Sequence, residues 1–414
     1  MTATTEQDGA VAAAIAGLLG GQVQDPFPLY DQLREAGDGV HWAAALNGWL
    51  VTRYDDVRTV AQDHGTFSSD IFFSSPPGLH DPTDDVHRRF VDINSRELMF
   101  ADPPRHTRLR SIFRSAFTPA AVDKWRPLVE SVTDQVLDRF RPGQEVELMS
   151  QVAADVPVAV IAAMLGVPAE QREKFREWSF AFASTFDPMV AGERRDECIR
   201  TSMQMLDYLA EVLADRRAHP QDDLTSLLAA ARADDGTPLA DADLLAQLAL
   251  LLVAGNETTT NLIGNGISLL LAHPAARGEL AHDRSLLPNA MEEMLRIDPP
   301  LHLTARKTTV PVVLGRQEIP ADALVITLMG AANRDPRAYA SPEAFDIHRQ
   351  NNRHLSFFHG IHFCVGSPLA RMEGEVMFDR FLTRFPDFAD AATPAVRRTS
   401  NVISRGWATR PVRL

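Results

Sequence analysis

The chain has two cysteines, Cys198 and Cys364, and the second lies where sulfur chemistry is favoured. Cys364 follows a run of aromatic and β-branched residues and comes just before a segment with helical periodicity, from Leu369 to about Pro386. The positive end of a helix dipole and free backbone N–H groups stabilise negative sulfur, so this location favours a thiolate. A thiolate here can bind a metal or act as a nucleophile. The alternative is a small buried apolar residue, the commoner role of a single free cysteine.

The residues around Cys364 form a dense motif. Five residues match the pattern F-x-x-G-x-H-x-C-x-G: Phe357, Gly360, His362, Cys364 and Gly366. This pattern resembles the cysteine-ligand loop of the cytochrome P-450 superfamily, whose thiolate binds the haem iron and pushes electron density towards O–O cleavage. The resemblance implies that the glycines let the backbone pass close to the porphyrin. The loop departs from the family pattern at Phe358, where Gly is frequent, and at Ser367, where Ala is common.

A second polar group lies inside the longest periodic segment, which predicts one helix from Asp243 to His273. At about 1.5 Å per residue this helix is roughly 46 Å long, enough to cross a domain. Residues 256–261 place Glu and Thr inside it, where they compete with the backbone hydrogen bonds and cost solvation energy. Such a violation is typical of a functional site. The alternative is a polar kink in which Thr bonds back to the backbone.

The stretch A-G-N-E-T within this helix resembles the oxygen-binding helix of the same superfamily. The resemblance implies that Ala254 and Gly255 lie beside the haem. It also implies that Glu257 and Thr258 relay protons during oxygen activation, a task for which a hydroxyl with a nearby carboxylate is suited.

Basic residues form a third group. His106 and Arg110 follow Asp102 and two prolines and are four residues apart, so they share one face of a predicted helix. By themselves they are typical of a solvated basic face. The resemblance implies that they bind a haem propionate, together with Arg306 and His362. Arginine suits this role because its planar guanidinium donates two parallel hydrogen bonds to a carboxylate.

A charged pair lies in another predicted helix, which Ser285 is expected to cap. Glu293 and Arg296 are three residues apart, and most such pairs are exposed and contribute under about 1 kcal/mol. The resemblance implies a structural ion pair, with Arg349 as its third member. We expect these residues to support the fold and the haem pocket rather than the chemistry.

The elements that must position these groups are mostly helices. Periodicity and turn residues predict helices at 25–36, through most of 120–233 and at 286–297, and strands at 48–52, 311–314, 324–329 and 401–405. Residues 70–104 show no regular pattern and predict a long functional loop. We therefore expect a mainly α fold with a small β region. By resemblance it is the cytochrome P-450 fold, with haem between the long central helix and the helix following the cysteine loop.

Composition narrows the class of protein. Residues 25–414 are expected to form one domain after a flexible N-terminus, residues 1–24, because no linker divides them. A net charge of −14 argues against binding to nucleic acid. The apolar run Val11–Leu19 is too short to span a bilayer, and the chain starts without the basic residues of a signal peptide. We expect a cytoplasmic protein with no membrane attachment and, given two cysteines, no disulfides.

The resemblance implies a haem-thiolate monooxygenase that uses heme b (iron protoporphyrin IX) and O₂. The expected reaction is hydroxylation or epoxidation of a hydrophobic or aromatic small organic substrate, of the kind made in secondary metabolism. A separate ferredoxin and ferredoxin reductase are the expected electron donors, docking on Arg105, Arg108, Arg114 and Arg353. Two alternatives stay open: a peroxide-driven or non-oxygenating haem enzyme of the same fold, and a non-catalytic haem gas sensor.

The substrate pocket is predicted only by position in the family pattern. Besides Ala254, its expected lining is Phe72, Phe73, Leu98, Met99, Phe182, Leu250, Leu301, Leu303 and Val402. His302 is available to orient a substrate. The aromatic segment Phe175–Met189 falls where the family has a mobile lid, although an aromatic stripe of this kind is more often core.

Overall fold

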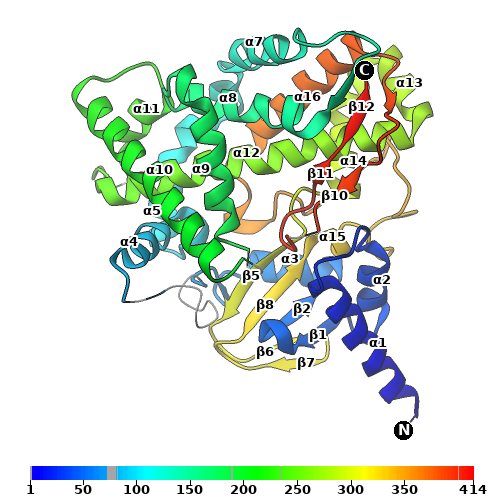
Figure 1. Cartoon of the computed structure of the whole chain (residues 1–414). Coiled ribbons are helices and arrows are strands. Elements are labelled where there is room, and N and C mark those ends of the chain that lie inside the picture. Colours follow the sequence, from blue (N-terminus) through cyan, green and yellow to red (C-terminus); the bar gives the residue numbers. More distant parts are fainter. Residues whose placement is uncertain (1, 72–80, 82, 188–189, 234, 400) are drawn as a thin grey trace.

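The computed structural model describes residues 2–71, 81, 83–187, 190–233, 235–399 and 401–414. Most helices gather in one part of the molecule, and the largest sheet, with α1 and α2, forms the other (Figure 1). Up to residue 184 the helices are α1 (Thr2–Leu19), α2 (Phe27–Glu35), α3 (Tyr54–Gln62), α4 (Asp85–Asn94), α5 (Arg105–Ala116), α6 (Pro119–Asp123), α7 (Arg126–Leu137), α8 (Asp155–Met164) and α9 (Arg172–Ser184). The later helices are α10 (Glu193–Ala218), α11 (Leu224–Ala230), α12 (Asp241–Ala272), α13 (Pro274–His282), α14 (Leu287–Ile297), α15 (Met329–Ala332) and α16 (Ser367–Arg384).

The strands are short: β1 (Val40–Ala43), β2 (Gly48–Val51), β3 (Phe67–Ser68), β4 (Glu145–Glu147), β5 (Leu303–Thr308), β6 (Val312–Leu314), β7 (Gln317–Ile319), β8 (Leu324–Leu328), β9 (Ala389–Asp390), β10 (Val396–Arg397), β11 (Trp407–Thr409) and β12 (Pro411–Arg413). The largest sheet has the order β1-β2-β8-β5-β3. β2 and β8 run parallel, with Gly48 opposite Leu324, and the other pairs are antiparallel. This sheet joins the N-terminal segment to β5, the strand that carries Arg306.

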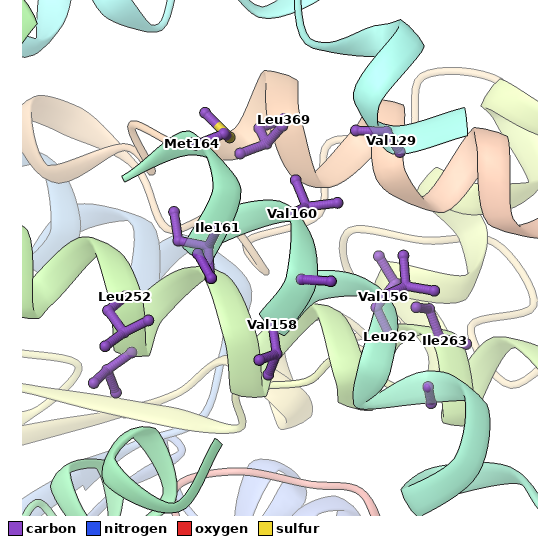
Figure 2. Packing of buried hydrophobic residues seen from close by; sticks show 14 of the residues in the cluster. Val129, Val156, Val158, Val160, Ile161, Met164, Leu252, Leu262, Ile263 and Leu369 are labelled. Atoms are coloured by element: carbon purple, nitrogen blue, oxygen red, sulfur yellow. The ribbon is translucent and has the colours of Figure 1, made fainter. Parts of the chain in front are cut away.

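The helical core is built around α12 and α8. Figure 2 shows buried side chains of α7, α8, α12 and α16 in one cluster, among them Val160 of α8, Leu262 of α12 and Leu369 of α16. Nearly every residue of α8 is buried. A helix that is apolar on all sides is stable only inside the protein. The mainly α fold with small sheets agrees with the expectation from the sequence.

α16 packs closely on α12 and α14 because glycines face these contacts. A β-carbon on Gly266 of α12 would collide with the ring of Phe378 of α16, and one on Gly374 of α16 would lie 2.5 Å from the sulfur of Met291 on α14. This packing fixes α16, the helix that follows Cys364, relative to α12 and α14.

Glu373 of α16 is a buried acid in this contact. Its side chain is 2% exposed, its Oε2 has no hydrogen-bond partner in the described part of the chain, and burial raises its pKa to about 8. The unfolded chain titrates near the ordinary glutamate value. Between these two pKa values unfolding releases a proton, so the carboxyl lowers stability progressively as the pH rises through this window.

Replacing Glu373 with glutamine is therefore expected to stabilise the protein at high pH. The gain should be on the order of 3 kcal/mol near pH 8.5 and close to zero near pH 4.5, measured by urea unfolding at both pH values. The exposed Glu211 on α10 offers a matched control, because E211Q should change stability equally little at both. A gain for E373Q that does not depend on pH would contradict the prediction.

Residues 70–104 differ from the expected long loop. They contain α4 and the 3₁₀ turn η3 (Leu98–Phe100). The side chain of Asp84 caps α4 by accepting hydrogen bonds from the N–H groups of Val86 and His87. The prolines that precede the cap obscured this short amphipathic helix in the sequence.

Three smaller differences concern chain ends and caps. The segment expected to be flexible contains α1, in which Ala14 and Ile15 are buried against neighbouring apolar residues. The side chain of Asp283, not Ser285, accepts the capping bond before α14. Residues 401–405 form no named strand, and the strands of this region are β10 and β11 on either side. The division into a flexible start and one domain stays a prediction.

No helix in the described ranges is long and apolar enough to cross a membrane.

Candidate active site

The loop before α16 is shaped by a residue that must be glycine. Gly360 begins a 3₁₀ turn with a φ of +69°, and a β-carbon there would collide with the carbonyl oxygen of Ala61. The loop therefore packs directly on α3. The N–H of Cys364 donates to the carbonyl oxygen of Phe357, 2.9 Å away, which fixes the cysteine at the end of this turn.

Desolvation and nearby hydrogen-bond donors act in opposite directions on the pKa of the Cys364 thiol. The residue has accessible surface, yet burial raises the pKa of its thiol. The two observations agree if the accessible surface faces the interior rather than bulk water. The N–H groups of Gly366 and Ser367 and the charges of Arg110 and Arg371 oppose the rise. The N–H groups at the helix start thus lower the pKa of the thiol, as the sequence predicts, while desolvation acts in the opposite direction. A bound metal ion reverses this balance, because it deprotonates a coordinating thiol.

The middle of α12 has an open face. Ala254 is exposed although it lies between buried residues, and the hydroxyl of Thr258 donates to its carbonyl oxygen at 2.6 Å. Thr258 thus bonds back to the helix backbone, as in the polar kink named above as the alternative. Its oxygen stays next to the open Ala254–Gly255 turn. Asn256 points elsewhere, because its amide donates to the hydroxyl of Ser179 on α9 at 2.9 Å.

Glu257 is paired with residues that the sequence gave no reason to select. Its Oε1 lies 2.8 Å from Nη2 of Arg398 and 2.8 Å from the hydroxyl of Ser404. Both partners belong to the C-terminal segment, more than 140 residues away. A cavity of about 200 Å³ adjoins the pair and is also lined by Ser184 and Asn401. Nothing local marks Arg398 in the sequence, since a long-range pair has no characteristic spacing.

The predicted propionate ligands lie together. His106 is 3% exposed, and its ring is 4.5 Å from the ring of His362. Burial lowers the pKa of His106, and burial with repulsion from Arg306, His106 and Arg110 lowers that of His362 to about 2. Burial also lowers the pKa of Arg306 to about 10. These shifts mean that the group disfavours further positive charge and suits an anion.

The residues fit a haem propionate by a second criterion. Nε2 of His106 is buried without a hydrogen-bond partner among the described residues. Arg306 is 6% exposed, donates to the carbonyl oxygen of Ala305 at 2.7 Å and forms no ion pair among the described residues, although the charge of Asp102 favours its protonated form. A buried donor and a buried cation without an anion are costly, and a carboxylate between them would satisfy both.

The three members of the predicted ion pair also meet. The guanidinium of Arg296 holds both oxygens of Glu293 at 2.7 Å, and Nε of Arg349 lies 3.0 Å from Oε1 of the same carboxylate. Glu293 and Arg296 are fully buried. Arg296 also donates to the carbonyl oxygens of Asn333, at 2.9 Å, and of Pro342, at 2.7 Å, so the pair ties α14 to the segment that leads to the cysteine loop.

The predicted substrate residues separate into groups. Met99 is 40% exposed, and Leu250 and Leu301 are half-buried. Leu98 and Phe182 are buried in the helical core, and Phe182 packs edge to face on Phe186 at 5.4 Å. Phe72 and Phe73 lie outside the described residues.

Leu303 and Val402 line a second cavity, next to α1. It has a volume of about 70 Å³ and is also lined by Ile15 and Leu18 of α1. Leu303 faces this side because side chains alternate along β5, so that Arg306 and Leu303 point to opposite faces. His302 lies here too, with its Nδ1 2.8 Å from the hydroxyl of Tyr30.

Comparison with known proteins agrees with this architecture. A family model described as "Cytochrome P450" matches residues 50–391. "Cytochrome P450 107B1" of Saccharopolyspora erythraea is 39% identical over 94% of this chain and 95% of its own, and "Cytochrome P450 monooxygenase PikC" of Streptomyces venezuelae is 37% identical over 94% and 91%. The crystal structure of P450BioI with a hexadec-9Z-enoic acid ligated acyl carrier protein has a TM-score of 0.86 at 30% identity, covering 94% of this chain and 98% of that one. The chain belongs to the cytochrome P450 family and is a cytochrome P450 monooxygenase.

Proposed function

We propose that the protein binds heme b through Cys364 and inserts one atom of O₂ into a hydrophobic or aromatic small organic molecule, by hydroxylation or epoxidation. The observation that carries the proposal is the group of buried Arg306 and His106 with half-buried His362 beside the cysteine loop, which suits the propionates of a haem. Bound haem supplies the redox chemistry, in which a thiolate ligand favours O–O cleavage. The residues of the chain bind the cofactor, orient the substrate and move protons.

We propose that Glu257 and Thr258 move these protons. The Thr258 hydroxyl lies on the open face of α12 and can hold a proton at Oγ1. Glu257 lies beside the 200 Å³ cavity and can exchange a proton with water there. Arg398 and Ser404 hold the carboxylate in this position.

Replacing Glu257 with glutamine is expected to lower O₂-dependent product formation about a hundredfold, because a positioned acid or base contributes 10² or more. R398Q should have a smaller effect in the same direction, since it releases the carboxylate without removing it. The measurements are product formed and hydrogen peroxide released per NADPH consumed, and peroxide should rise as product falls.

Arg96 provides a matched control for the Arg398 variant. It also pairs with an acid on α12, Asp243, at 3.3 Å, but about four turns away from Glu257. R96Q should keep the wild-type ratio of product to peroxide. An equal rise in peroxide for R96Q and R398Q would mean that any loss of charge on α12 causes it, and the role of Arg398 would be wrong.

We propose that a ferredoxin, reduced by its reductase, docks beside the cysteine loop. A cavity of about 440 Å³ there is lined by Arg58, Arg353 and Phe363, and Phe363 is 38% exposed directly before Cys364. Of the expected cations, Arg108 is paired with Asp235 at 2.8 Å, and Arg105 donates to the carbonyl oxygen of Ser95 at 3.1 Å, so both serve the fold. The side chain of Arg114 lies outside the described residues.

Reversing the charge at Arg353 should slow reduction by a ferredoxin about tenfold at low ionic strength, because rim charges act mainly on association rates. The difference should disappear in high salt, as followed by stopped-flow absorbance of the haem. R316E makes the same charge change on an exposed arginine beyond the sheet and should reduce at the wild-type rate. A loss with R353E that persists in high salt would argue against electrostatic docking.

We propose that the substrate is a mainly apolar molecule of the size of a macrolactone or a steroid. The relatives include proteins named "6-deoxyerythronolide B hydroxylase" and "Vitamin D(3) 25-hydroxylase", and a structural neighbour is described in complex with testosterone. Secondary metabolism and a cytoplasmic location are part of the same proposal. A panel of macrolactones and steroids, scored by the shift of the Soret band, would identify the class.

One experiment tests the proposed reaction against its alternatives. The best Soret ligand is incubated with the protein and either O₂ with NADPH, ferredoxin and reductase, or hydrogen peroxide alone. We expect product with O₂ and little with peroxide. Product with peroxide only would indicate a peroxide-driven enzyme, and none with either would favour a gas sensor.

A further inference from the structure

Phe358 has an unusual backbone conformation for a bulky residue. Its φ is +59°, in the left-handed region that non-glycine residues seldom occupy. The conformation belongs to the turn of the cysteine loop, because the N–H of Phe358 donates to the carbonyl oxygen of Leu355 at 2.8 Å. A glycine would adopt it without strain. Strained backbone of this kind persists only where surrounding contacts favour it.

The side chain of Phe358 provides such a contact. Its ring centroid lies 4.6 Å from the guanidinium carbon of Arg306, a cation–π arrangement. The ring also packs against the apolar cluster that includes Val57 and Leu355, which keeps it in place. Arg306 is 6% exposed, so the ring is part of what removes its guanidinium from water. A cation–π contact is stronger in such a desolvated setting.

The cysteine loop has two residues in the left-handed conformation, Phe358 and Gly360, and it has room for a side chain at the first of them. At Gly360 a β-carbon would collide with the Ala61 carbonyl oxygen, whereas at residue 358 the side chain points at Arg306. Arg306 otherwise donates only to its neighbour's carbonyl oxygen among the described residues. A long arginine side chain with one hydrogen bond to the protein loses rotamer freedom when it binds an anion, and stacking on a ring reduces that loss.

We propose that Phe358 is a positioning residue for the cofactor: its ring holds the Arg306 guanidinium in the orientation that meets a haem propionate, and the left-handed backbone is the strain that this arrangement requires. The inference rests on the proposed propionate role of Arg306. It explains why this chain has a phenylalanine where the family motif frequently has glycine.

The test measures haem release from the holoprotein into excess apomyoglobin, followed by the Soret band. F358L and F358G should release haem about tenfold faster than wild type, and F358Y, which keeps an aromatic face, should release it at the wild-type rate. F358L should unfold at a temperature close to that of wild type, because leucine keeps most of the apolar contact with the cluster of Val57 and Leu355. If Phe358 had only a structural role, haem release in F358L, F358G and F358Y would instead follow their unfolding temperatures.

A double-mutant cycle with R306Q decides whether Phe358 acts through Arg306. R306Q should itself accelerate haem release, and adding F358L should then change nothing. An unchanged tenfold effect of F358L in the R306Q background would overturn the inference. A wild-type release rate for R306Q alone would refute the propionate role of Arg306, a separate failure.

The carbon monoxide difference spectrum gives a readout independent of release. All Phe358 variants should keep the spectrum of a thiolate-ligated haem. Its loss in F358L would mean that the ring shapes the cysteine loop rather than Arg306, and the inference would be wrong.

Discussion

Replacing Cys364 with serine is expected to abolish O₂-dependent turnover and the thiolate signature in the carbon monoxide difference spectrum. Serine keeps the size of the side chain, but its hydroxyl is a poor donor to iron and does not push electron density towards O–O cleavage. The variant should still bind haem, because the buried side chains of His106 and Arg306 remain. Haem content by the pyridine haemochromogen assay separates loss of ligation from loss of cofactor.

The other cysteine provides the control. Cys198 lies on α10, and both cysteines are free. C198S should have the wild-type spectrum and activity. If C364S kept the thiolate spectrum, the assignment of Cys364 as the ligand would be wrong, whatever its activity.

The largest effect on stability is expected from replacing Glu293 with glutamine. The substitution leaves Arg296 charged, fully buried and without its carboxylate, and breaking a buried pair in this way costs about 3–5 kcal/mol. Arg349 and Asn352, both bound to the same carboxylate at 3.0 Å, lose their partner as well. The measurement is the free energy of unfolding in urea, with haem incorporation as a second readout.

An exposed pair with the same spacing provides the comparison. Glu173 and Arg176 on α9 are also three residues apart, at 3.0 Å, but the Glu173 side chain is 84% exposed. E173Q should cost under about 1 kcal/mol, because water already solvates both charges. Equal losses for E173Q and E293Q would show that burial does not decide the strength of these pairs.

Several features of the site could be predicted because they are local in the sequence. The spacing from Phe357 to Gly366 places a cysteine directly before a helix, and the structure has that helix as α16. The long periodic segment is one helix, α12, as expected. The spacing of Glu293 and Arg296 puts both on one helical face, where they meet. In each case the helix repeat alone determines which side chains are neighbours.

Other features could not be read from the sequence because burial and strand direction are tertiary properties. Leu303, predicted beside the substrate, lines the cavity under α1, since the alternation along β5 becomes meaningful only once its two faces are known. Phe182 packs against the rings of Phe90 and Phe186 in the helical core. At Cys364 the donors of the helix start favour a thiolate, and desolvation opposes them.

By itself, then, the sequence determined the family, the cysteine loop and the long central helix, because motif and periodicity are properties of neighbouring residues. Only the tertiary structure decided which groups bind each other across the chain: Arg398 with Glu257, and Phe358 with Arg306. These pairs depend on folding distant segments into contact, and no local pattern encodes their partners. Burial then sets how strongly each pair interacts, because a charged group attracts its partner more strongly where water is excluded.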